Sequence, residues 1–214
     1  FYRLDEVSGN IESDGNYLSL SELKGVVKNG EATVKNKVTL FDWKTKKAIN
    51  PKFELELNNL YSNHFLFFVK GLDSAKFSAT GTLGVEFFND HVSLEARDNV
   101  TLKNFKLMTV SGTQEIVGNE LVRIQNQGKI DIQFNGQVNF NTFALFKNSK
   151  LGIFGFVNGD EVQVDVGKSW IDFEESGPIV GTQILGKGDV LGKIRGPLDN
   201  VVFDLKMSQS GFQV

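Results

Sequence analysis

The stretch that decides the fold reads Gly188-Asp-Val-Leu-Gly-Lys-Ile-Arg-Gly-Pro-Leu-Asp-Asn-Val-Val-Phe-Asp-Leu-Lys-Met207. Side chains of a β-strand point to opposite faces with a period of two. Both halves of this stretch follow that period, so each half has one small or apolar face and one largely polar face. The small or apolar positions are Val190, Gly192, Ile194 and Gly196 in the first half and Val201, Phe203, Leu205 and Met207 in the second.

The two halves are separated by Pro197-Leu-Asp-Asn200. Proline cannot donate a hydrogen bond to a strand ladder, and Asp and Asn favour turns. We therefore expect two antiparallel strands joined by a bend at Gly196–Asn200. Because two strands with an apolar face are barely stable alone, the rest of the chain has to supply further strands.

Alternating apolar and polar residues recur along most of the chain. The longest runs are Ala75–Phe87 and Lys129–Phe140, and the turn-forming pairs Asn29-Gly30 and Asn158-Gly159 separate shorter ones. Strands joined by short turns lie antiparallel, and this pattern predicts about a dozen of them. The sequence thus predicts an all-β fold, an antiparallel β-meander forming one continuous domain over residues 1–214.

Some segments depart from this alternation. Ser111–Gln125 is the best helix candidate, because Ser111 and Gln114 have the spacing of a capping box and Val117, Leu121 and Ile124 recur with a helical period. Phe143–Phe156 is apolar and irregular, compatible with a short helix and a strand. We further expect a loop over 41–50, turns at Asn58-Asn59 and Asp98-Asn99, and a β-bulge between Leu102 and Phe105.

Composition excludes several classes of function. The chain has 214 residues, a net charge of −3 and no cysteine, so it has no disulfide and no thiolate metal site. Nucleic-acid surfaces show clustered Lys and Arg, which are missing here, so we expect no nucleic-acid partner. The longest apolar run, Phe65–Val69, is far shorter than the ~20 residues of a spanning helix. Since the chain starts at Phe1 without a signal-type segment, we expect a processed chain or a piece of a longer protein.

Residues for catalysis are scarce. The two histidines, His64 and His91, have no metal-ligand spacing. Paired carboxylates occur at Glu54/Glu56 and Glu174/Glu175, and the first pair has the position of solvated residues on the polar face of a strand. No phosphate-binding loop pattern occurs. We therefore predict that the protein is not an enzyme and needs no cofactor or metal.

Two architectures explain the many half-apolar strands. In a β-sandwich or barrel, the apolar faces close on each other as a core. In a curled single sheet, with the cross-section of a taco, the apolar face stays partly open as a groove, and exposed apolar patches of that size usually mark binding. The residues predicted to line the groove are Phe77, Leu83, Val85, Phe87, Val92, Leu94, Val100, Leu102, Ile130, Ile132, Phe134, Val138, Phe140, Val162, Val164, Val166, Val190, Ile194, Val201, Phe203 and Leu205.

The stretch Gly188–Leu205 resembles the recurrent repeat of the AsmA-like and TamB-like proteins of Gram-negative envelopes. Asp14–Gly25 and Gln127–Val138 are similar but looser, and Ser111–Gln125 and Phe143–Phe156 depart from the repeat. The resemblance implies a periplasmic β-groove that is anchored in the inner membrane through missing parts of the chain. It implies phospholipid acyl chains as ligand, conducted between inner and outer membrane, with outer-membrane assembly proteins as further partners.

The leading prediction is therefore a non-enzymatic periplasmic groove for lipid acyl chains in outer-membrane biogenesis. The alternative is a closed β-sandwich that serves as an adhesion, carbohydrate-binding or scaffold module. We therefore predict that Val138→Arg stays folded, because the long side chain reaches water from an open groove, and that it loses lipid binding. In a closed core the same change should unfold the protein.

Overall fold

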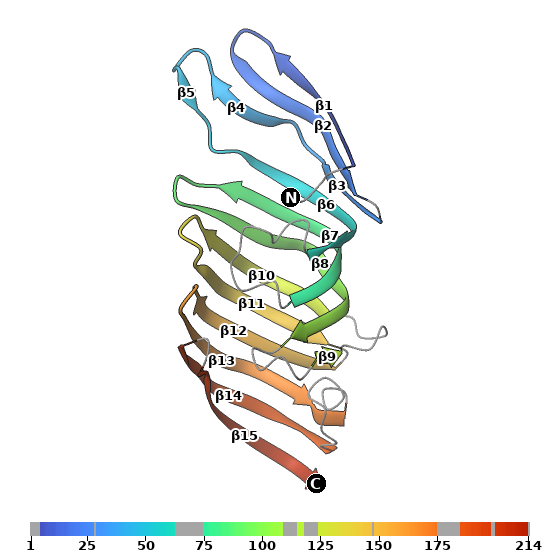
Figure 1. Cartoon of the computed structure of the whole chain (residues 1–214), viewed down its shortest axis with the longest axis vertical. Coiled ribbons are helices and arrows are strands. Elements are labelled where there is room, and N and C mark those ends of the chain that lie inside the picture. Colours follow the sequence, from blue (N-terminus) through green and yellow to red (C-terminus); the bar gives the residue numbers. More distant parts are fainter. Residues whose placement is uncertain are drawn as a thin grey trace.

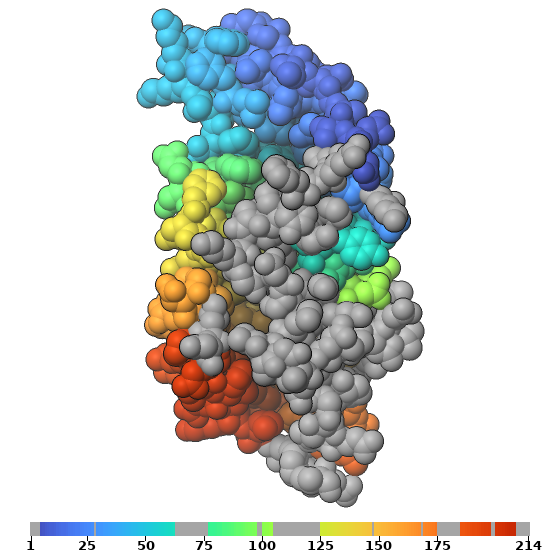
Figure 2. All heavy atoms as spheres, in the orientation of Figure 1, coloured from blue at the N-terminus to red at the C-terminus, as the bar shows by residue number. Residues whose placement is uncertain are grey.

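The computed structural model describes residues 5–27, 29–62, 75–108, 115–117, 124–146, 148–174, 185–197 and 200–213. In these residues, fifteen strands form one sheet in which every pairing is antiparallel. Figure 1 shows the strands stacked along the long axis of the molecule, and in Figure 2 the atoms of β1–β5 lie at one end and those of β14–β15 toward the other. The prediction of an all-β antiparallel fold is confirmed.

The strands follow the chain closely. They are β1 (Glu6–Ser13), β2 (Tyr17–Val27), β3 (Gly30–Val34), β4 (Val38–Asp42), β5 (Lys47–Ala48), β6 (Lys52–Tyr61), β7 (Ala75–Phe87), β8 (His91–Met108), β9 (Glu115–Val117), β10 (Ile124–Gln133), β11 (Val138–Phe146), β12 (Ser149–Val157), β13 (Glu161–Asp172), β14 (Leu185–Pro197) and β15 (Val202–Gln213). The order across the sheet is β15-β14-β13-β12-β11-β10-β8-β7-β6-β3-β2-β4-β5, while β1 pairs with β2 and β9 with β8. From β6 to β15 the sheet is therefore a meander, apart from the side strand β9.

Register aligns the apolar residues of successive strands in transverse rows. The first row consists of Phe53, Val85, Leu94, Ile130, Phe140, Gly155, Val164, Ile194 and Phe203, each directly opposite the next. The second row consists of Phe87, Val92, Ile132, Val138, Val157, Val162 and Gly196. Because residues directly opposite each other share a face, these rows make one apolar surface that crosses the sheet.

Several local predictions are confirmed. The run Ala75–Phe87 is a strand with those bounds, and the pairs Asn29-Gly30 and Asn158-Gly159 lie where β2 turns into β3 and β12 into β13. The strands on either side of Pro197–Asn200 are antiparallel neighbours. The expected bulge in β8 also occurs, at Asn104, which has a positive φ of 53°.

The run Lys129–Phe140 is not one strand. β10 ends at Gln133, and the turn that follows contains Asn135-Gly136, with a φ of 93° at Gly136. In the sequence, small or apolar residues keep alternating with polar ones through these turn residues, so the pattern gives no sign of the turn. Ile132 and Val138 still share a face, because they are paired across the resulting hairpin.

Other local predictions are wrong. The pairs Asn58-Asn59 and Asp98-Asn99 lie inside β6 and β8, the expected loop at 41–50 contains the end of β4 and all of β5, and Phe143–Phe156 forms a β-hairpin. Within the proposed helix Ser111–Gln125, residues 115–117 and 124–125 are strand, and the others lie outside the described residues. At these positions, pairing with neighbouring strands outweighs the local preference for a turn or a helix.

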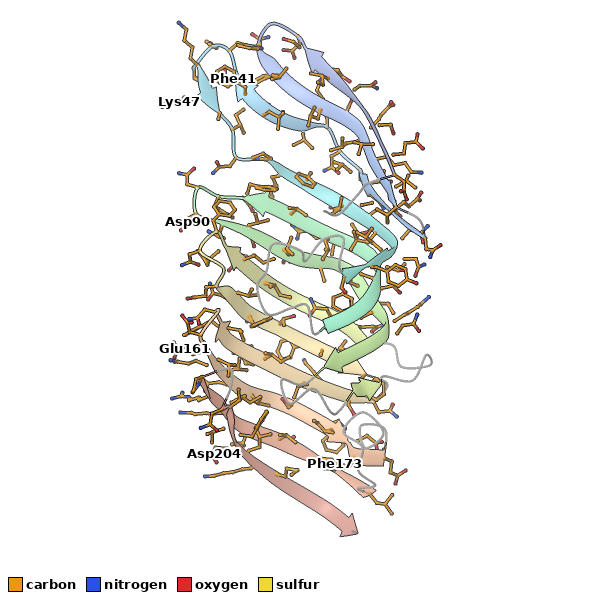
Figure 3. The ribbon with its side chains drawn as sticks, in the orientation of Figure 1. Phe41, Lys47, Asp90, Glu161, Phe173 and Asp204 are labelled. Carbon is orange, nitrogen blue, oxygen red and sulfur yellow. The ribbon has the colours of Figure 1, made fainter. Side chains whose placement is uncertain are left out.

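Bulges occur at a similar level in many strands. The register shifts between Leu57 and Leu60 in β6, between Asn126 and Lys129 in β10, and between Val166 and Ser169 in β13. Figure 3 shows the hairpin tips at Asp90 and Glu161 along one margin of the sheet. The register shifts lie on the other side of the first row, away from these tips. Bulges bend strands. In Figure 1, β6, β7 and β8 bend at the end of the strands that lies away from these hairpin tips.

Side-chain hydroxyls satisfy backbone groups at these bulges. The N–H of Asn59 donates to Thr80 Oγ1 at 3.1 Å, and the N–H of Gly152 donates to Ser169 Oγ at 3.0 Å. Thr142 Oγ1 donates to the carbonyl oxygen of Gln127 at 2.8 Å. Each hydroxyl comes from a neighbouring strand, and those of Thr80 and Ser169 bond backbone N–H groups where the register shifts.

We expect Ser169→Ala to lower the free energy of unfolding by about 1–3 kcal/mol, because it leaves the buried N–H of Gly152 without this acceptor. Ser169 is 3% exposed, so water cannot easily replace the hydroxyl. Urea unfolding measures the change. Ser8→Ala, at an exposed serine of β1, should stay within about 0.5 kcal/mol, and an equal loss in both variants would contradict this role.

Candidate functional site: the apolar face of the sheet

The residues predicted to line a groove share one face of the sheet but differ in exposure. Nine are buried: Leu83, Val85, Val100, Ile132, Val138, Val162, Val164, Val166 and Val190. Nine are half-buried: Phe77, Phe87, Val92, Leu94, Leu102, Ile130, Phe140, Ile194 and Val201. Phe134, Phe203 and Leu205 are exposed. Phe134 lies in the β10–β11 turn, and the other two lie on the outermost strand β15.

The buried residues form three clusters along this face. One gathers around Leu57, Leu83 and Val85, and a small one consists of Ile132 and Val138. Leu94 packs against both, so these two clusters are continuous. The third gathers around Val164 and Val190 on β13 and β14. The apolar face thus has a continuous packed area over β6–β11 and a second one toward the C-terminal strands.

A hollow of about 460 Å³ opens in the first area. Its lining is almost wholly apolar and comes from β6, β7, β8, β10 and the turn after β10: Phe53, Leu55, Leu57, Leu83, Val85, Phe87, Val92, Leu94, Ile132, Gln133 and Phe134. Pockets for small ligands have about 300–1,000 Å³ and a similar apolar lining. The sequence prediction missed Phe53, Leu55 and Leu57, although they alternate with Lys52, Glu54 and Glu56 as clearly as the residues it included.

The rim of the hollow is held by contacts between adjacent hairpins. The N–H of Phe134, whose side chain is 62% exposed, donates to the carbonyl oxygen of Asp90 at 3.0 Å. A hydrogen bond from His91 Nδ1, 2.7 Å away, lowers the pKa of the Asp90 carboxyl. The His91 ring stacks on Phe88 with 4.3 Å between centroids. The Phe134 side chain therefore lies at the rim of the apolar hollow, on a turn whose backbone is hydrogen-bonded to the neighbouring hairpin.

The opposite face of the same strands is charged. Lys52 and Glu86 form an ion pair of 3.1 Å, Arg97 and Glu95 one of 2.9 Å, and Lys35 and Glu56 one of 3.5 Å. A second hollow, of about 450 Å³, lies among these side chains over Gly84 and Ser93. Charges of both signs alternate here, so this hollow offers no uniform field for one charged ligand.

Farther along, the opposite face carries aromatic rings that the sequence prediction did not place there. Cross-strand pairing puts Phe143, Phe154 and Phe156 on the face opposite to Phe140 and Ile153. Phe143 and Phe154 meet edge to face at 5.5 Å, and Lys150 Nζ lies 4.0 Å from the Phe143 ring. Because both faces are apolar in this hairpin, its sequence shows no clean alternation.

Metal-binding groups do not gather in the described part of the chain. It has no cluster of three or more His, Asp or Glu that could hold a metal ion. It also has no helix that is long and apolar enough to cross a membrane. His91 is engaged with Asp90 and Phe88, and His64 lies outside the described residues.

Comparisons of the chain with protein-family models, with curated proteins and with solved structures find no match. The resemblance to AsmA-like and TamB-like repeats therefore stays a prediction from residues 188–205 and their looser counterparts. The functional proposal therefore rests on the geometry of the apolar face.

Val138 is less accessible than an open groove requires. Its side chain is 3% exposed and packs with Ile132. Because this position would bury an unpaired guanidinium, we expect Val138→Arg to unfold the protein. We expect a loss of about 3 kcal/mol or more in urea unfolding. Asn141→Arg, at an exposed position of the same strand, should leave stability within about 0.5 kcal/mol; a stable Val138→Arg protein would show that this part of the face opens.

Proposed function

We propose that this protein binds an acyl chain on the apolar face of its sheet, in the hollow beside Phe134, without catalysing a reaction. The observation that supports the proposal is the apolar lining of that hollow, to which five successive segments of the sheet contribute. A ligand there would meet aliphatic and aromatic side chains almost exclusively. An acyl chain has the matching chemistry, because it offers apolar surface and no hydrogen-bonding group.

The energy of such binding would come from burial alone. Each methylene group transferred from water to an apolar site contributes about 0.8 kcal/mol. Contacts of this kind have no preferred direction, so the hollow would accept chains of different length and saturation. A bound acyl chain would need no hydrogen bonds from the protein. The charged groups of these strands point to the opposite face.

The transverse rows suggest a wider role. They continue the apolar surface from the hollow toward β14 and β15, where Ile194 and Phe203 end the first row. Following the resemblance to AsmA-like and TamB-like repeats, we propose that acyl chains of phospholipid move along this surface in the periplasm, between inner and outer membrane. This transport role rests on the binding role and can fail separately from it.

Val92→Trp tests the binding site, because the indole of this half-buried residue would occupy the hollow. Displacing two methylene groups of a bound chain costs about 1.6 kcal/mol, so the Kd for a fluorescent long-chain fatty acid should rise by more than about tenfold. Fluorescence titration measures the Kd, and a thermal melt checks that the variant folds. Leu94→Trp, on the neighbouring row, repeats the test with a second variant.

The matched control is Lys129→Trp, which places the same ring on the charged face of β10. Its Kd should equal that of the unsubstituted protein. No fatty-acid binding by the folded unsubstituted protein would overturn the proposal. Equal binding by all variants, or an equal loss in the control, would place any bound chain outside this hollow and would overturn it as well.

A further inference from the structure

The face of the sheet opposite to the apolar rows carries two polar rows of its own. One consists of Glu54, Gly84, Glu95, Lys129, Asn141, Phe154, Asp165 and Lys193, each directly opposite the next. The other consists of Lys52, Glu86, Ser93, Asp131, Asn139, Phe156, Gln163 and Arg195. Because residues directly opposite each other share a face, the two rows form one polar strip that crosses the sheet from β6 to β14.

The hollow of about 450 Å³ over Gly84 and Ser93 lies within the polar strip. Gly84 leaves room there, because a Cβ at this position would lie 2.7 Å from Arg97 Nε. The charged groups around the hollow are Lys52, Glu54, Glu86, Glu95, Arg97 and Lys129. Acidic and basic groups are equal in number, so a ligand here meets acceptors and donors of hydrogen bonds and no net charge.

Farther along, the same strip carries aromatic rings. Phe154 is three strands away from Glu95, which is about 14 Å at the usual strand spacing. Phe154 and Phe156 are half-buried, and the Phe154 ring is held against Phe143 above Gly152, where a side chain would collide with both rings. The polar residues directly opposite the two rings of the strip are Asn139, Asn141, Gln163 and Asp165.

A neutral ligand with many hydroxyl groups matches both parts of the strip. A hydroxyl group donates and accepts hydrogen bonds, so it can pair with carboxylates, amides and ammonium groups alike. A sugar ring also presents C–H groups, whose slight positive charge suits the negative face of an aromatic ring. A charged polymer would instead meet like charges in the hollow. Rings flanked by amides, together with a hollow of balanced charge, therefore favour a sugar.

We propose that the polar strip binds a neutral oligosaccharide, with one sugar residue in the hollow at Gly84 and a later one stacked on Phe154 and Phe156. The separation of about 14 Å requires a chain of several sugar residues. The residues between the two ends lie over β10 and β11, beside Lys129 and Asn141. This binding does not depend on the proposed acyl-chain binding, which uses the opposite face of the sheet.

Isothermal titration calorimetry of the protein with maltohexaose, cellohexaose and chitohexaose tests the proposal. We expect at least one of these neutral hexasaccharides to bind, and to bind at least about tenfold tighter than its monosaccharide, because only the longer chain reaches both ends of the site. Since the ligand carries no charge, its Kd should change less than about twofold when NaCl is raised from about 0.1 M to about 1 M.

Two substitutions test the two ends of the site. Phe154→Leu keeps an apolar side chain over Gly152 but removes the ring, so the Kd of the hexasaccharide should rise about fivefold. Gly84→Val fills the hollow and should reduce the affinity of the hexasaccharide to that of the monosaccharide. Its side chain would displace only the flexible end of Arg97, so the variant should fold, and thermal melts check both variants.

Trp43→Ala is the matched control, because it removes an aromatic ring that is 46% exposed and lies outside the polar strip. The Kd of the hexasaccharide should not change in this variant. The proposal is wrong if none of the three hexasaccharides binds, or if the polyanion heparin binds more tightly than all of them. It is also wrong if Trp43→Ala abolishes binding while folded Phe154→Leu and Gly84→Val proteins retain it.

Discussion

The side-chain period of a strand is the constraint on which this structure depends. A shift of one residue would send every later side chain of the strand to the other face. In β13 the inward positions are Val162, Val164 and Val166 before the bulge and Ser169 and Ile171 after it, so one extra residue changes the inward set from even to odd numbers. Shifts of this kind recur in several strands of the sheet, although β11 and β12 pair without one. Register shifts occur in the pairings of β6, β8, β10 and β13.

This constraint also explains where polar groups are buried. Each bulge takes a backbone group out of the ladder, and a buried backbone group without a partner is costly. Thr80 and Ser169 supply such partners from adjacent strands. Short hydroxyl side chains suit this task, because they reach a neighbouring backbone group without displacing the apolar rows. The hydroxyls therefore serve the bending of the sheet.

The sequence was sufficient for the fold class and for most strands, because alternation and hairpin turns are local signals. Ala75–Phe87 and the hairpin around Pro197–Asn200 show this. It failed where a strand continues through residues that favour turns, as at Asn58-Asn59, since only pairing with neighbouring strands holds such residues in a ladder. It also failed at Asn135-Gly136, where a real turn interrupts an alternation that continues in the sequence. For the candidate site, the face of each residue could be predicted, but the hollow could not, since its shape depends on how strands separated in sequence bend together.

Among the described strands, β1 and β15 lie at opposite ends of the sheet, and they differ in regularity. A bulge interrupts β1, whereas β15 is regular and alternates Phe203, Leu205 and Met207 with Asp204 and Lys206. Binding on the apolar face would use the side chains of the hollow, which lies over β6–β10 and not over β15.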